Sequence, residues 1–142
     1  MDNNLQINQN AEQTYHSICQ SIVSAQHRLS AAVNSTMVIT YWEIGEQIYK
    51  VCGENDRAEY GKKLLQYLSE QLTAEFGKGF SVQGLRNMRQ FYCTFPNRST
   101  LWSDLSWSHY RLLMRVPDEQ ARTFYMEECV KSAWSVRQLE RQ

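Results

Sequence analysis

The residues of this sequence best suited to chemistry are the amide and guanidinium side chains that follow position 82. An Arg side chain can pair bidentately with guanine, and an Asn or Gln side chain can pair in the same way with adenine. The stretch between Glu75 and Asp104 contains no acidic residue. The sequence therefore predicts a positive, amide-bearing surface with the donors that the major groove of DNA requires. The residues of this predicted interface are Lys78, Gln83, Arg86, Asn87, Arg89, Gln90 and Arg98.

Two kinds of contact are expected from this set. The amides and Arg86 suit base edges, whereas Lys78 and Arg98 lie in the flanking turns and suit phosphates. The alternative is a plain solvent face that lacks acids and binds nothing. The net charge does not decide between a DNA-binding surface and a plain solvent face, because the fifteen basic and fifteen acidic residues of this 142-residue chain cancel.

A helix must position these side chains, and its limits can be predicted. Ser81 is a good N-cap, since its hydroxyl can accept a hydrogen bond from a backbone N–H two or three residues later. Phe80 and Leu85 have the spacing of a hydrophobic staple across the helix start. Pro96 cannot continue the helix and restrains the residue before it. One arc of this helix is apolar, and the opposite arc carries the amides.

A second helix is expected before this one, from Gly61 to Phe76, with Asp56 as a possible cap. Its apolar residues recur at helical spacing, and Gly77-Lys78-Gly79 closes it because glycine adopts a left-handed conformation at little cost. Two helices joined by such a turn are a helix-turn-helix candidate.

The N-terminal third predicts one long helix from Thr14 to Val51, in which apolar residues recur every three or four positions. Residues 1–12 are rich in Asn and Gln and are expected to be a flexible leader, which leaves 13–142 as a helical module. The β-branched cluster at 36–40 offers an alternative, a break into two helices. A helix of this length predicts a homodimer, and the alternative is antiparallel pairing with later helices of the same chain.

The C-terminal part predicts three shorter helices, so the fold class is all-α with about six helices. Ser106 caps the first, which is expected to run from Trp107 to Val116. Asp118 caps the second, to about Ser132. Its expected apolar stripe contains Ala121, Phe124, Tyr125, Glu128 and Cys129. Residues 135–138 match a capping box and start a last helix, whose short length suggests that the natural chain continues.

Composition argues against several other functions. The four cysteines form no CxxC pair and no zinc spacing, so we expect no metal, no cofactor and a reducing, cytoplasmic location. No apolar run reaches the length of a membrane span. Ser108 and His109 are neighbours in the sequence, and adjacent residues on a helix point apart, so His109 is expected to be a hydrogen-bonded partner at a helix start. Neither catalysis nor a small-molecule substrate is expected for this chain.

Six short stretches resemble the N-terminal domain of the YhcG family, a set of bacterial proteins whose C-terminal domain resembles PD-(D/E)XK nucleases. They occur in the family's order and cover the chain from about residue 25 to its end. The resemblance implies a helical module, thought to bind DNA or mediate assembly, in front of a nuclease domain. No D…(D/E)xK arrangement after a strand is present here, so no catalytic residues carry over. The six stretches are 41–45 (YWEIG), 60–65 (YGKKLL), 68–72 (LSEQL), 80–92 (FSVQGLRNMRQFY), 105–110 (LSWSHY) and 134–139 (WSVRQL).

Overall fold

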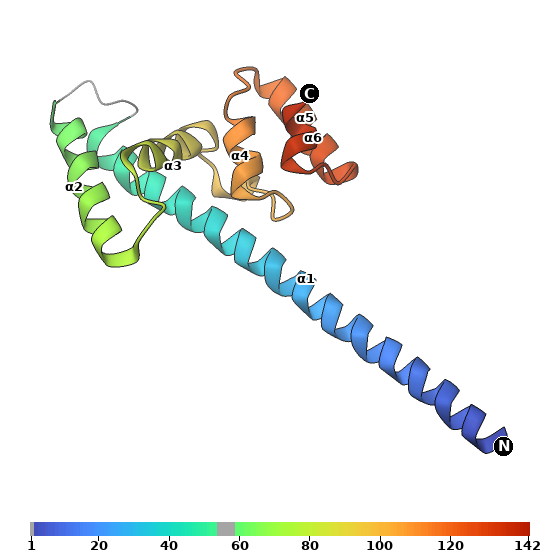
Figure 1. The fold of residues 1–142 in the computed structure, drawn as a ribbon. Helices are drawn as coiled ribbons and strands as arrows, with labels where there is room; N and C mark the ends of the chain where they lie inside the picture. Colours follow the sequence, from blue (N-terminus) through green and yellow to red (C-terminus); the bar gives the residue numbers. More distant parts are fainter. Residues whose placement is uncertain (1, 54–58) are drawn as a thin grey trace. The chain divides into compact units, whose positions relative to one another are not determined.

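The computed structural model describes residues 2–53 and 59–142, with side chains described for 9–53 and 61–142. Within these residues the secondary structure is entirely helical, which confirms the predicted all-α fold (Figure 1). Residues 1–33 and 34–142 form two compact units. The proposed capping role of Asp56 lies outside the described residues. The helices are α1 (Asp2–Cys52), α2 (Glu59–Phe76), α3 (Val82–Thr94), the 3₁₀ helix η1 (Arg98–Thr100), α4 (Trp107–Leu113), α5 (Glu119–Lys131) and α6 (Val136–Glu140).

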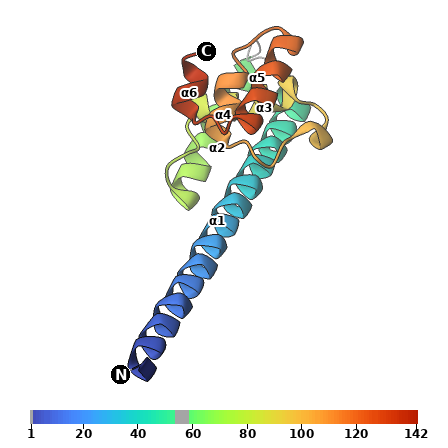
Figure 2. The same ribbon diagram turned by 90° about the vertical axis from the view of Figure 1, so that its right-hand side faces the viewer.

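Helix α1 is continuous, so the predicted alternative of a break at residues 36–40 is wrong (Figure 2). The hydroxyl of Thr40 donates to the carbonyl of Thr36 at 2.8 Å, which shows a β-branched residue bonding to the preceding turn without interrupting the helix. The helix begins at Asp2, so α1 includes residues 2–12. No Pro or Gly lies among them, and extending an existing helix costs much less than starting one.

The second unit is built on a close crossing of α1 and α3. A Cβ atom on Gly45 of α1 would overlap the carbonyl oxygen of Met88 on α3, so only glycine fits there. One turn earlier, the indole N–H of Trp42 donates to the carbonyl of Phe95 at 2.7 Å. These contacts hold residues 38–52 of α1 against α3.

Two groups of buried side chains fill this unit. The smaller group lies between α1, α2 and α3 and contains Ile48, Leu65, Leu85 and Met88. The larger group joins α1 and α3 to the C-terminal helices and contains Val38, Trp42, Phe91, Phe95, Leu105, Tyr110, Leu113, Met126, Cys129 and Leu139.

The turn between α2 and α3 is confirmed as predicted. Gly77 and Gly79 have φ angles of +83° and +113°, the left-handed region that favours glycine. The Ser81 hydroxyl accepts from the N–H of Gly84 at 3.0 Å and so caps α3. Helices α2 and α3 pack against each other across this turn.

The C-terminal helices differ from the prediction at two points. Helix α4 ends at Leu113 and not at Val116, because the chain tightens into i→i+3 hydrogen bonds as it approaches Pro117. On α5 the buried residues are Met126 and Cys129, whereas Phe124 is 54% exposed. Apolar residues lie all around α5, so its sequence does not favour one face. The caps of Asp118 and Ser135 are confirmed.

Candidate nucleic-acid interface

The amide side chains of the predicted interface form a row along one edge of α3. Gln83 and Gln90 are exposed, and Asn87 is half-buried between them. The amide N–H of Gln83 donates to the Asn87 side-chain oxygen at 3.1 Å, and that of Gln90 donates to the hydroxyl of Thr94 at 3.2 Å. These i,i+4 contacts order the row, while each amide keeps further donor and acceptor capacity toward solvent.

The two arginines of α3 lie on a different edge, and Arg89, a residue of the predicted interface, is buried. Arg89 is 5% exposed, and its guanidinium donates to the sulfur of Cys52 on α1 at 3.4 Å. The cause is the crossing at Gly45, since a Cβ there would also lie 3.1 Å from the backbone nitrogen of Arg89. Helix α1 therefore covers Arg89, whereas Arg86, one turn earlier, is half-buried.

The two predicted phosphate contacts differ in their surroundings. Lys78 is exposed in the turn between the two left-handed glycines. Arg98 is also exposed, but its guanidinium lies 3.4 Å from the carboxylate of Glu43 on α1. The sequence around Arg98 contains no acidic residue, but the surface around it does. The carboxylate comes from Glu43, a residue 55 positions earlier.

A hollow of about 330 Å³ brings together parts of α1, α3 and α4. The amides of Gln83 and Asn87 line it beside Arg111, an exposed residue of α4 that the sequence reasoning missed. Nothing local in the sequence marks Arg111, because only the packing of α4 against α3 places it there. The rings of Tyr41 and Trp107 also line the hollow, with centroids 4.9 Å apart. A cation therefore stands next to these amides, with no carboxylate among the described lining residues.

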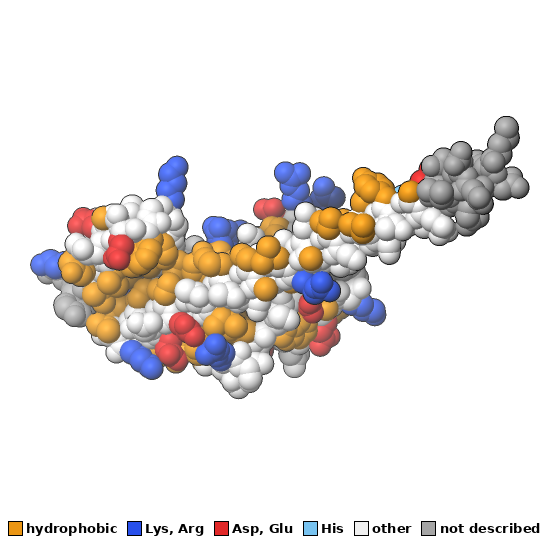
Figure 3. Space-filling view, turned by 90° about the horizontal axis from the view of Figure 1, so that it is seen from below, with side chains coloured by type: hydrophobic (Ala, Val, Ile, Leu, Met, Phe, Trp, Pro, Cys, Tyr) orange, Lys and Arg blue, Asp and Glu red, His pale blue; other side chains and the backbone are white. Residues whose placement is uncertain are grey.

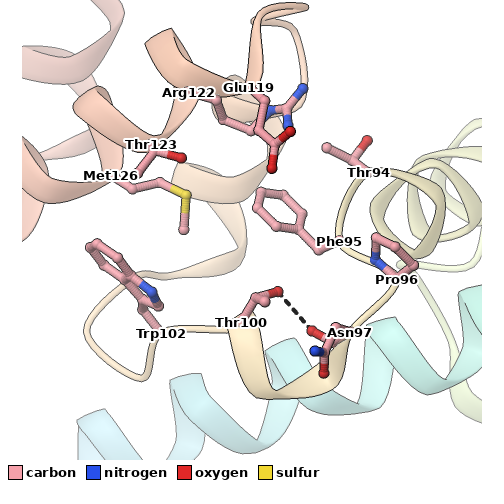
Figure 4. Close-up of a pocket in the computed structure, with 10 residues that line it drawn as sticks. All are labelled: Thr94, Phe95, Pro96, Asn97, Thr100, Trp102, Glu119, Arg122, Thr123 and Met126. Atoms are coloured by element: carbon pink, nitrogen blue, oxygen red, sulfur yellow. Dashed lines mark hydrogen bonds between the residues drawn. The ribbon is translucent and has the colours of Figure 1, made fainter.

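A second hollow, of about 360 Å³, lies between the loop after α3 and helix α5 (Figure 4). Arg122 lies 5.7 Å above the ring of Phe95 and donates to the carbonyl of Val116 at 3.0 Å, while its Nε–H has no hydrogen-bond partner among the described residues. Glu119 also lines this hollow (Figure 4). This carboxylate makes the second hollow a poorer place for phosphate than the first.

The predicted role of His109 at a helix start is confirmed. Its Nδ1 lies 2.7 Å from the Ser106 hydroxyl and 3.3 Å from the Ser106 backbone nitrogen, and its Nε2 lies 2.9 Å from the carbonyl of Trp134. The last contact requires a proton on Nε2, so Nδ1 accepts from Ser106. Nδ1 thus caps the start of α4, and Nε2 joins α4 to the residue before the α6 cap.

Two buried groups have raised pKa values for structural reasons. Burial raises the pKa of the Tyr110 hydroxyl to about 12, against a smaller opposing effect of its hydrogen bond to the backbone of Trp102. Burial also raises the pKa of the Cys129 thiol. The described side chains contain no group of three or more His, Cys, Asp or Glu residues placed to hold a metal ion. None of the helices in the described part of the chain combines the length and hydropathy needed to span a membrane.

Comparisons with known proteins give two matches. A family model described as the DUF1016 N-terminal domain matches residues 17–142. The Escherichia coli (strain K12) protein named "Putative nuclease YhcG" is 32% identical over 164 aligned positions, which cover 92% of this chain and 44% of that protein. The chain therefore spans less than half the length of this relative. No solved structure gives a significant match.

Proposed function

This chain belongs to the DUF1016 N-terminal domain family, and from this premise we propose that it is the non-catalytic, DNA-binding module of a nuclease. The nuclease part of the proposal comes from the name of the E. coli relative. The DNA-binding part depends on the surface of α3 and α4. The four free cysteines suit a reducing compartment, so the proposal also expects a cytoplasmic location.

One observation carries the proposal: Arg111 lies beside the Gln83 and Asn87 amides around a single hollow. Asn and Gln side chains can pair with adenine in the major groove, and a cation beside them can contact the flanking phosphate. Lys78, in the turn before α3, adds a second phosphate contact. Arg86 remains in the proposed interface, whereas Arg89 is reassigned to holding α3 against α1.

The proposal is tested by binding titrations of this chain against duplex DNA over a series of salt concentrations. Arg111→Ala should weaken binding and lower the slope of log affinity against log salt by about one, because one phosphate contact is lost. Asn87→Ala should weaken binding to the preferred sequence by roughly 5- to 100-fold with little change in slope.

Arg137→Ala is the matched control, because it removes an exposed Arg from α6, away from α3. It should change neither the affinity nor the slope. Equal titration curves for Arg111→Ala and Arg137→Ala would remove the α3–α4 surface from DNA recognition. The same titrations with single-stranded DNA and with RNA would identify the preferred nucleic acid.

A second candidate function is a dimerisation scaffold, and the exposed apolar residues of α1 favour it. Leu29 is 67% exposed and Ile22 is 53% exposed, although both are residues that normally lie inside proteins. Sedimentation equilibrium tests this candidate by the mass of the chain. A scaffold should show a mass that rises with concentration, whether or not the chain binds DNA.

A further inference from the structure

The N-terminal part of α1 exposes a stripe of apolar side chains. Within residues 9–33, five large apolar residues are at least half exposed, although they share one side of the helix. Figure 3 shows exposed hydrophobic side chains on several parts of the surface, including α1. The five residues are Tyr15 (66%), Ile18 (53%), Ile22 (53%), Leu29 (67%) and Val33 (53%).

The spacing of this stripe is that of a coiled-coil seam. Apolar residues follow each other at alternating intervals of four and three, which is the 3.5-residue repeat of two helices that wind around each other. A single-helix surface packed on a globular core more often has a broader, less regular apolar face. The seam consists of Ala11, Tyr15, Ile18, Ile22, Ala25, Leu29 and Ala32.

The charge of this segment favours an apolar helix as its partner. Glu12 and Arg28 are the charged residues among positions 9–33, so neither a polyanion nor an acidic peptide has a matching surface here. A buried Leu, Ile or Val removes roughly 60–120 Å² of apolar surface from water, and a buried Tyr about 150–250 Å². Because the seam residues are only about half exposed, dimerisation would bury on the order of 300 Å² of their apolar surface per copy. Side chains flanking the seam bring a self-paired interface toward the ~1,000 Å² that a specific complex needs.

The sizes of the seam residues favour one orientation. One set of alternate positions holds Tyr15, Ile22 and Leu29, and the other set holds Ala11, Ala25 and Ala32 together with Ile18. In a parallel pair each residue faces its own copy, which leaves Ala-on-Ala layers underpacked next to layers of two large side chains. In an antiparallel pair the first set faces the second, so large residues mostly face small ones and the layers fill evenly.

We propose that residues 11–32 pair in antiparallel orientation with the same residues of a second copy of this chain. Two registers of this pair are possible, one heptad apart. In each register, six layers of facing seam residues lie within residues 11–32. In one register Tyr15 faces Ala32 and Ile22 faces Ala25. In the other, Tyr15 faces Ala25 and Ile22 faces Ile18. The proposal gives the dimerisation scaffold a defined contact, and it does not depend on DNA binding by α3.

The first test is the mass of the chain in sedimentation equilibrium. At ~100 μM, a concentration that saturates a dimer with a micromolar Kd, the natural sequence should be dimeric. Ile22→Asp should weaken the dimer at least 10-fold, because it buries a carboxylate in the seam. Gln20→Asp, an exposed change on the opposite side of the same helix, should leave it intact. A monomeric natural sequence, or an Ile22→Asp variant that dimerises normally, would overturn the proposal.

The second test measures orientation by spin-label distances between two copies. Single labels are placed on Gln13→Cys or on Gln20→Cys after Cys19, Cys52 and Cys93 are changed to Ser. A helix rises about 1.5 Å per residue. In both antiparallel registers, the distance along the helix axis between the two copies' labels is therefore about 21 Å larger for labels at position 13 than for labels at position 20. The measured distances should therefore differ by at least about 10 Å. Equal distances at the two sites would show a parallel pair and overturn the orientation.

These experiments also separate the dimer from the DNA interface. The substitutions at positions 13, 20 and 22 lie far in sequence from Asn87 and Arg111, and the mass and the distances are measured without DNA. A dimer without DNA affinity would refute the proposed DNA-binding role alone, and DNA binding by a monomer would refute the dimer alone.

Discussion

Residues 9–33 and residues 38–52 belong to the same helix and share the same periodicity, but their apolar side chains have opposite surroundings. Ile22 is 53% exposed and Ile48 is 3% exposed. The difference lies in what covers each segment. Gly45 lets α3 approach the backbone of the second segment, and Leu65 of α2 and Leu85 of α3 complete the cluster around Ile48. An apolar stripe thus defines which face of a helix must be covered, and other elements decide whether this chain covers it.

The comparison also explains the difference in expected roles. The second segment is part of a folding core, because its contacts are made within residues 34–142. The described residues of the first segment expose their stripe, so these side chains are available for another molecule. Substitutions in the second segment should change folding stability, and substitutions in the first should change association.

The largest effect is expected for Gly45→Ala. The added Cβ would overlap the Met88 carbonyl oxygen, a backbone atom that cannot move without separating α1 from α3. We expect a loss of at least about 3 kcal/mol in the free energy of unfolding, despite a gain of ~1 kcal/mol in helix propensity. Urea denaturation followed by circular dichroism measures this loss.

Gly84→Ala on α3 is the control for that measurement. Its Cβ would lie 3.2 Å from the Gly79 carbonyl oxygen and from the Ser81 hydroxyl, a tight but tolerable approach. Its effect should be within about 1 kcal/mol. If Gly45→Ala is no more destabilising than Gly84→Ala, the close crossing does not organise the fold.

The next effect compares Ile48→Ala with Ile22→Ala, the same substitution in the two segments of α1. The first removes a buried side chain and leaves a cavity, so it should cost about 3 kcal/mol. The second should change the unfolding free energy of the monomer by less than about 1 kcal/mol. Denaturation at low protein concentration measures both values, and similar losses would contradict the contrast between the segments.

The smallest effect concerns Tyr110, whose hydroxyl accepts from the Trp102 N–H at 2.6 Å and donates to the Trp102 carbonyl at 3.3 Å. Tyr110→Phe leaves both backbone groups without this partner and should cost about 1–2 kcal/mol at pH 7. The exposed Tyr15 provides the control, since Tyr15→Phe should change stability by less than ~0.5 kcal/mol.

The raised pKa of Tyr110 adds a pH dependence with a defined sign. The pKa of its hydroxyl is about 12 in the folded chain, whereas the ordinary value of 10.0 applies to the unfolded chain. As pH rises, the unfolded chain therefore loses this proton first. The stabilisation is complete below pH 10 and is lost between about pH 10 and pH 12. The natural sequence should therefore lose more stability than Tyr110→Phe between pH 9 and pH 11. Parallel losses in the two proteins would contradict this role of Tyr110.

The candidate interface shows where sequence reasoning succeeded and where it failed. The cap at Ser81 and the row of Gln83 and Asn87 depend on the local geometry of one helix, and the structure shows both as the spacing requires. The sequence predicts Arg89 as part of the interface, but α1, a segment remote in sequence, covers it. Arg98 gained a carboxylate partner from the same remote helix. Arg111 was missed because only the packing of α4 beside α3 brings it to the amides.

The sequence by itself determined the helices, most of their caps and the turn at residues 77–79, because capping hydroxyls, glycines and a 3.6-residue period act over a few neighbouring residues. It also determined that α1 carries an apolar stripe along most of its length. Only the tertiary structure decided which part of that stripe is covered, which arginine is buried and which cation stands beside the amides. These outcomes depend on contacts between residues tens of positions apart, where side-chain shape and the close approach at Gly45 matter more than local preference.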